Sequence, residues 1–228
     1  YKRQVMFLAC CFNGSLCAQS DAQIYERTCD AKTYPFSDPS PVATPNNSYY
    51  PYFRFDGFSM QAQEKQWKMV VLENDYVKLT VTPEIGGKIW GAIDKVNNKE
   101  FVYTNGVVKF RDVAMRGPWT SGGIEFNFGI IGHAPTCSTP IDYLTKKNVD
   151  GSVSCHIFSY EWITRTVWNV EINLPKDKAY FTTHTTWFNQ SSIDQPYYQW
   201  MNAGYATKTG TRFYYPGTYS TVSYTHLT

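Results

Sequence analysis

The side chains most capable of chemistry lie in one stretch, Arg116 to Pro135, which holds five glycines, two prolines, a Trp, a carboxylate, an amide and a histidine. Glu125 and Asn127 alternate with apolar residues, so in a strand both polar side chains point to the face opposite the apolar ones. His133 follows in a loop bounded by Gly and Pro. Such groups suit a sugar site, where aromatic rings stack on the sugar and polar groups take its hydroxyls. A bulged strand whose polar residues only satisfy backbone groups would show the same pattern.

Glu125 and His133 are the two candidate catalytic residues. A carboxylate beside apolar walls is suited to general-acid chemistry, which makes Glu125 the first candidate. A rim carboxylate paired with Arg116 or Arg111 would explain Glu125 equally well. His133 is able to act as an acid or to bind a sugar hydroxyl, although an exposed loop histidine without a function has the same sequence signature.

Five further residues are candidates for substrate binding. Trp119 and Trp200 are able to act as stacking platforms, although a Trp in a β-protein is often a core residue. Asn202 shares a strand face with Trp200, as Asn127 does with the candidate acid, and amides of this kind bind hydroxyls. Arg116 is able to hold the carboxylate of a uronic acid through two hydrogen bonds, or simply to bind a loop carbonyl.

The composition excludes two classes of function and favours one fold class. A formal net charge of +2 without a basic run gives no footprint for nucleic acid. No apolar run reaches the ~18 residues that a membrane-spanning helix needs. The 18 Tyr and 14 Phe, set among many Thr and Val, favour strands over helices. We therefore predict an all-β protein with no nucleic-acid partner and no transmembrane span.

The chain divides into four segments. Residues 1–18 have the basic start, short apolar stretch and small-residue cleavage site of an incomplete signal peptide, so we expect export to the periplasm or the extracellular space. Residues 19–66 are rich in Pro and Tyr, which predicts an extended lead-in. Residues 67–221 are the predicted sandwich, truncated at its C-terminus. Residues 222–228 are expected to be a non-native tail.

The predicted strands come from alternating apolar residues between turn signals. They cover residues 68–72, 76–82, 88–95, 100–104, 124–128, 141–147, 152–160, 164–174, 179–189, 196–207 and 211–215. Strands at this spacing without a helical stretch predict an antiparallel β-sandwich. Removal of the signal peptide leaves Cys29, Cys137 and Cys155, so at most one disulfide is expected, and their scattered spacing gives no zinc pattern.

The sequence also resembles a known family. Residues 71–90, which include the pair Gly-Gly before a Lys, resemble the opening hairpin of galactose mutarotase-like domains, and residues 92–105 resemble the strand that follows it. Within residues 119–128, the motif Gly-Gly-Ile-Glu-Phe-Asn-Phe, together with residues 132–135, resembles one bacterial family of large exported proteins. Members of that family often carry tetratricopeptide repeats after the sandwich. The resemblance covers residues 67–221.

The resemblance implies a β-supersandwich that binds carbohydrate, a fold shared by aldose epimerases, glycosidases and polysaccharide lyases. In mutarotases a histidine acts as the acid and a late glutamate as the base, so the second catalytic group is expected beyond residue 221. We therefore expect an exported domain that binds and processes glycans, with no cofactor. A non-catalytic carbohydrate-binding module is the alternative. A metal site formed by Glu125, His133 and His184 is a third hypothesis, without the paired-histidine spacing typical of such sites.

Overall fold

The structure is a computed structural model, and it describes residues 20–35, 59–112, 118–129, 133–162, 164–212 and 214. The expected signal peptide, residue Arg116 and the expected tail at 222–228 lie outside the described residues. The same holds for residues 36–58 of the expected lead-in.

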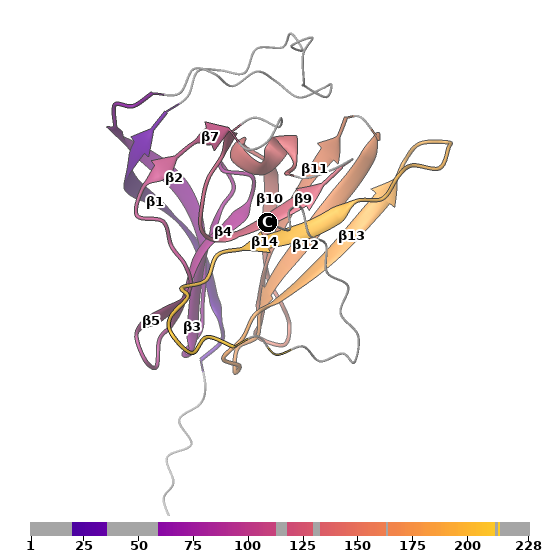
Figure 1. Ribbon diagram of the computed structural model, residues 1–228. Helices are drawn as coiled ribbons and strands as arrows, with labels where there is room; N and C mark the ends of the chain where they lie inside the picture. Colours follow the sequence, from indigo (N-terminus) through magenta and orange to yellow (C-terminus); the bar gives the residue numbers. More distant parts are fainter. Residues whose placement is uncertain are drawn as a thin grey trace, which may run out of the picture.

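The described chain forms two main sheets, and the prediction of an all-β sandwich is confirmed (Figure 1). The large sheet has eight strands in the order β14-β9-β4-β3-β2-β1-β6, with β5 beside β4. The second sheet has the order β10-β11-β12-β13, and β7 pairs with β8 in a short ribbon. The large sheet is mixed rather than wholly antiparallel, because β1 and β6 run parallel.

The bounds of the elements are as follows. The large sheet contains β1 (Gln23–Tyr34), β2 (Gln63–Glu73), β3 (Val77–Thr82), β4 (Lys88–Asp94), β5 (Lys99–Val102), β6 (Val108–Lys109), β9 (Ile124–Phe128) and β14 (Gln199–Ala203). The second sheet contains β10 (Asp142–Lys147), β11 (Val153–Glu161), β12 (Thr166–Leu174) and β13 (Thr182–Asn189). The ribbon consists of β7 (Arg111–Asp112) and β8 (Pro118–Trp119), and a single 3-10 turn, η1 (Pro135–Ser138), follows β9.

The alternation of buried and partly exposed residues along the strands shows that the core lies between the two sheets. Along β12, every second residue is buried, as expected for a strand with one covered face. Its Trp168 is fully buried and stacks on Phe128 of β9, with ring centroids 4.5 Å apart and planes inclined by 11°. The strand that carries the candidate acid is therefore anchored to the second sheet by its apolar face.

The expected lead-in begins instead with a strand of the sandwich. β1 pairs with β2 from Gln23, opposite Glu73, to Thr33, opposite Gln63. The large sheet therefore starts at Gln23 rather than at Trp67. The signal was missed because β1 has few large apolar residues, and most of its side chains are exposed or half-buried. At the other end, Thr211, Arg212 and Tyr214 are not in a strand, contrary to the prediction for 211–215.

The large sheet has a second covered face, which we call the outer face because it turns away from the second sheet. Trp67 and Met69 of β2 lie on it and pack with Trp90 of β4, while Val70 of β2 belongs to the core between the sheets. Ile89 of β4 lies opposite Ile124 of β9, and both belong to that inter-sheet core. Residues one position away from this pair therefore project to the outer face.

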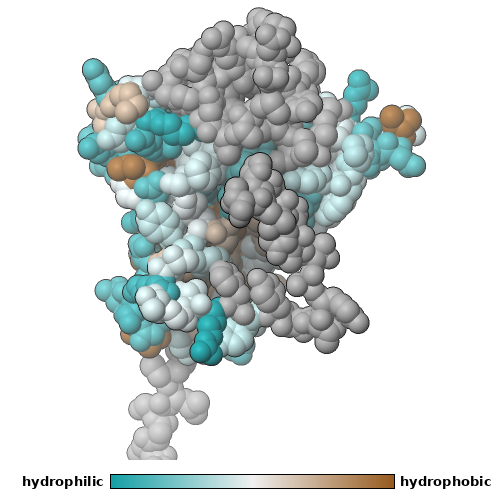
Figure 2. Space-filling view, in the orientation of Figure 1, coloured by the Kyte–Doolittle hydropathy of each residue, from teal (hydrophilic) through white to brown (hydrophobic). Residues whose placement is uncertain are grey.

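The remaining surface carries hydrophobic side chains in separate places. On the coloured part of the face in Figure 2, brown atoms form small isolated spots among white and teal ones.

Cys29, Cys137 and Cys155 are thiols rather than disulfides. Among the described residues, no helix has the length and apolarity needed to cross a membrane.

Candidate functional site

Glu125 and His133 form a short polar contact on the outer face. His133 Nδ1 lies 2.5 Å from Glu125 Oε1. The side chain of Glu125 is 3% exposed and that of His133 is 14% exposed. The expectation that both residues belong to one site therefore agrees with the geometry, and the imidazole is the more accessible of the two groups.

Asn127 fixes both members of this pair. Its Nδ2 donates a hydrogen bond to Glu125 Oε1 at 3.0 Å, and its Oδ1 accepts one from the backbone N–H of Ala134 at 2.7 Å. Asn127 is fully buried, so these bonds are not exchanged with water. The amide thus holds the carboxylate on one side and the backbone directly after His133 on the other.

Two glycine turns bring the elements of the site together. Gly123 precedes β9 with φ +67°, and a Cβ there would lie 2.2 Å from the carbonyl oxygen of Ile89, so only glycine allows β9 to approach β4 so closely. Gly86 has φ +64°, and a Cβ there would lie 2.6 Å from the carbonyl oxygen of Thr136 in η1. The turn before β4 therefore supports η1, which continues the loop that carries His133.

Two indoles flank the imidazole of His133. The ring centroid of Trp200 lies 5.0 Å from that of His133 at an angle of 69°, and the centroid of Trp119 lies 6.0 Å away at 64°. Both contacts have the edge-to-face geometry that aromatic rings favour. In the register of β9 and β14, Trp200 lies opposite Asn127 and Asn202 lies opposite Glu125. All four of these residues therefore share the outer face.

We call the residues Glu125, Asn127, His133, Trp119, Trp200 and Asn202 the Glu125–His133 cluster. Two buried polar atoms of this cluster have no hydrogen-bond partner among the described residues. They are Oε2 of Glu125 and Nε1 of Trp119. A buried carboxylate oxygen can accept a hydrogen bond and an indole N–H can donate one. A hydroxyl group or a water molecule both donates and accepts, so it has the chemistry to satisfy atoms of these two kinds.

Lys88 is a further member of this cluster that the sequence analysis did not single out. It lies on the outer face of β4 and is 1% exposed, and its Nζ donates to the backbone oxygen of Thr120 at 2.8 Å and to Thr120 Oγ1 at 3.1 Å. Burial lowers the pKa of Lys88, and the negative charge of Glu125 acts in the opposite direction. The sequence feature that could have indicated the burial of Lys88 is its position between the Gly86-Gly87 turn and the apolar Ile89.

Cys137 adds a third titratable side chain beside this pair of opposite charges. Burial raises the pKa of its thiol, and the charge of Glu125 adds to this effect while that of Lys88 opposes it. The thiol therefore stays protonated at neutral pH. Cys137 contributes apolar volume at this place rather than a nucleophile.

The hydrogen bonds fix the orientation of the pair. One oxygen of Glu125, Oε1, accepts the amide N–H of Asn127 and also contacts Nδ1 of His133. In this arrangement Glu125 orients His133, whose imidazole is the more exposed of the two groups.

The other predicted residues have different outcomes. Arg116 lies outside the described residues. Among the described residues, Glu125 is hydrogen-bonded by His133 and Asn127 rather than by Arg111. His184 lies on β13 of the second sheet, opposite Glu171. No group of three or more His, Cys, Asp or Glu side chains in the described part of the chain is arranged to hold a metal ion.

Glu161 is a second buried carboxylate near the end of β9. A Cβ at Gly129 would lie 3.6 Å from its Cγ. Its Oε2 accepts hydrogen bonds from the backbone N–H of Thr164 at 2.6 Å and from Thr164 Oγ1 at 2.5 Å. These bonds hold the turn between β11 and β12, so a structural role accounts for this carboxylate.

The fold and the site define an all-β sandwich domain with a buried acid–histidine pair on the outer face of its larger sheet. The chain belongs to the family described as Domain of unknown function (DUF5107), whose model matches residues 44–226. A solved structure described as a TPR-domain containing protein from Parabacteroides distasonis ATCC 8503 is similar to it, with 26% sequence identity and a TM-score of 0.74. The match covers 81% of this chain and 32% of the solved one, so this chain spans about a third of the length of that protein.

Proposed function

We propose that this domain binds glycans on the outer face of its large sheet and processes them by proton transfer at His133, with Glu125 as its orienting carboxylate. The observation that carries the proposal is the 2.5 Å contact between His133 Nδ1 and Glu125 Oε1, flanked by the rings of Trp119 and Trp200. An oriented imidazole supplies acid–base chemistry. Indole rings beside it supply apolar surface for a sugar ring.

Proton transfer of the epimerase type fits the cluster better than glycoside hydrolysis. Glycosidases of the common type need two catalytic carboxylates that flank the scissile bond. Glu125 is covered by His133, and Glu161 is engaged with Thr164, so neither is arranged for that role. We accordingly favour a galactose mutarotase-like supersandwich in which His133 acts as one member of an acid–base pair.

The setting of the domain is part of the same proposal. We propose export to the periplasm or the extracellular space, on the strength of the signal-like start of the sequence. We further propose that tetratricopeptide repeats belong to the same protein, because the similar solved chain is described as TPR-containing and is about three times as long as the matched part. The glycan would then be an oligo- or polysaccharide met outside the cytoplasm.

The test is turnover by the intact protein on a panel of plant and microbial oligosaccharides. His133→Asn and Glu125→Gln should each lower turnover by about 10²–10⁴-fold, the contribution of a positioned acid or base, while glycan affinity changes little. His184→Asn is the matched control, because this histidine is exposed on the second sheet and should leave turnover unchanged. Equal turnover in His133→Asn and wild type would refute the catalytic role.

The alternative is a non-catalytic carbohydrate-binding module, and the two flanking indoles are the observation that favours it. In that case the wild type shows no turnover on any glycan that it binds. Affinity would then be lost with Trp119→Ala or Trp200→Ala and kept with Glu125→Gln. Failure of the intact protein to bind any carbohydrate would exclude both functions.

A further inference from the structure

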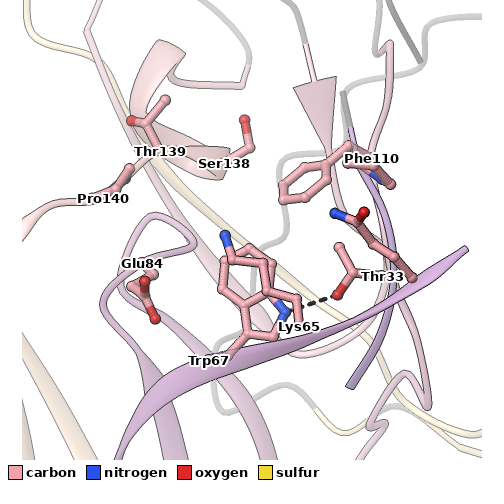
Figure 3. A pocket seen from close by; sticks show the side chains of 10 residues that line it. Thr33, Lys65, Trp67, Glu84, Phe110, Ser138, Thr139 and Pro140 are labelled. Carbon is pink, nitrogen blue, oxygen red and sulfur yellow. Dashed lines mark hydrogen bonds between the residues drawn. The ribbon is translucent and has the colours of Figure 1, made fainter. Parts of the chain in front are cut away.

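A separate pocket of about 320 Å³ opens on the outer face, on the side of β1 and β2 (Figure 3). Its volume lies within the usual range of small-molecule sites, about 300–1,000 Å³. The walls include Lys65, Trp67, Glu84, Phe110, Ser138 and Thr139. None of these residues belongs to the Glu125–His133 cluster.

The aromatic floor of the pocket is fixed in place. Trp67 is 4% exposed, its Nε1–H donates to Thr33 Oγ1 at 2.9 Å, and its ring centroid lies 6.2 Å from that of Phe110. A fixed indole gives an apolar surface with little loss of side-chain entropy on binding. The floor of the pocket is therefore a rigid apolar wall beneath the Lys65 ammonium group.

Among the described residues that line this pocket, Lys65 is the only one with a positive charge. Its Nζ lies 3.8 Å from the centroid of the Trp67 ring, so the ammonium group is held over the floor of the pocket (Figure 3). No carboxylate among the described residues forms an ion pair with it. The ammonium group of Lys65 thus lacks a partner of opposite charge at a place where a ligand can supply one.

The one acidic residue of the lining does not supply that partner. Glu84 Oε2 accepts a hydrogen bond from the backbone N–H of Lys68 at 2.5 Å. With Lys65 and Glu84 together, the described lining carries no net charge, so an anion is attracted only by direct contact with the Lys65 ammonium group. The hydroxyl group of Thr139 adds a partner for sugar hydroxyls.

The pocket is linked to the candidate catalytic pair through the chain. His133 and Ala134 contact Glu125 and Asn127, and the same segment continues through η1 to Ser138 and Thr139 in the pocket wall. We propose that this pocket is a subsite for a sugar unit that carries a carboxylate, a uronic acid, with its carboxylate on Lys65 and its hydroxyl groups toward Thr139. This inference rests on the proposed function, because it names the class of glycan which that site would process.

The probe is trigalacturonic acid, compared with galactotriose as its neutral counterpart, in titrations with the intact protein. The wild type should bind the acidic trisaccharide at least about tenfold more tightly, the effect of one hydrogen bond to a charged group. Lys65→Gln should abolish this preference and Lys65→Arg should keep most of it. Lys147→Gln removes the same charge from the exposed end of β10 and should leave the preference intact.

Three results would overturn the inference: a preference that survives Lys65→Gln, one lost equally in Lys147→Gln, or acetate competing as well as the trisaccharide. Glu125→Gln should retain the acidic preference, because it changes the other site. If the wild type binds both trisaccharides equally, the uronate subsite alone is refuted. If it binds neither of them, nor any other glycan, the proposed function fails as well.

Discussion

At the scale of single residues, the proposed division of roles between Glu125 and His133 follows from their exposure. The carboxylate is the less exposed of the two and is held by Asn127 and His133, so it keeps one orientation. The imidazole is the more exposed group, and its Nδ1 is committed to the carboxylate. Glu125 is the first candidate from the sequence, whereas the proposed function gives the direct role to His133, the more exposed group.

A buried thiol provides a pH test of the packing. Burial raises the pKa of Cys155 from an ordinary value of 9.0 to about 12. Below pH 9 the thiol is protonated in both states, whereas between pH 9 and 12 only the unfolded chain ionises. Stability should therefore fall over this window, by about 4 kcal/mol at pH 12 from this residue.

The measurement is the free energy of unfolding from denaturant titrations at several pH values. Cys155→Ala removes the titrating group, so its stability should fall less steeply above pH 9 than that of the wild type. Identical pH slopes in the two proteins would show that the thiol is not shielded as the structure has it.

At the scale of elements, the start of β9 depends on Gly123. Gly123→Ala combines a left-handed φ with a Cβ placed 2.2 Å from a backbone oxygen, so we expect a loss of about 3 kcal/mol or more. Gly210→Ala is the matched control: its φ is also positive, at +90°, but no atom of the described residues lies within 4 Å of the added Cβ. It should cost only about 1 kcal/mol.

Urea unfolding of both variants gives the comparison. The difference between them isolates the close approach of β9 to β4, since the conformational strain is common to both. A Gly123→Ala protein as stable as the Gly210→Ala protein would contradict the packing described for the site.

Strands with alternating apolar residues were predictable, and polar strands were not. The predictions for β9 and β12 agree with the structure, because each has one face in the core. The sequence pattern predicts an extended lead-in where the structure has β1, because the pairing of β1 with β2 is a long-range contact that a local pattern does not show. For the same reason, the sequence showed Lys88 as part of a strand but not its burial beside Glu125.

At the scale of the whole molecule, Asn74 joins the two sheets. Its Nδ2 donates to the backbone oxygens of Pro175 at 2.7 Å and Lys178 at 2.8 Å, in the turn between β12 and β13. Its Oδ1 accepts from the backbone N–H groups of Tyr76 and Val77 in its own turn. All four bonds are made by a side chain in a residue that is 4% exposed.

Asn74→Ala should therefore lower the free energy of unfolding by about 2–4 kcal/mol. The substitution leaves buried backbone groups without a hydrogen-bond partner both in the turn before β3 and in the turn between β12 and β13. Asn97→Ala is the control: this exposed amide donates to Asp94 within the turn between β4 and β5 and should cost less than about 1 kcal/mol. Thermal or denaturant unfolding measures both changes. An equal, small effect of the two substitutions would mean that Asn74 does not connect the sheets.

The central claim is that a glycan is bound against the indoles that flank His133. The most direct measurement is the affinity of the intact protein for a glycan that it binds, compared between Trp200→Ala and Trp162→Ala. Trp162 is 77% exposed in the turn after β11 and contacts Tyr160 rather than His133. We predict that Trp200→Ala weakens binding about tenfold or more, as expected for a central aromatic contact, while Trp162→Ala has no measurable effect. Unchanged affinity in Trp200→Ala, or an equal loss in Trp162→Ala, would contradict this account.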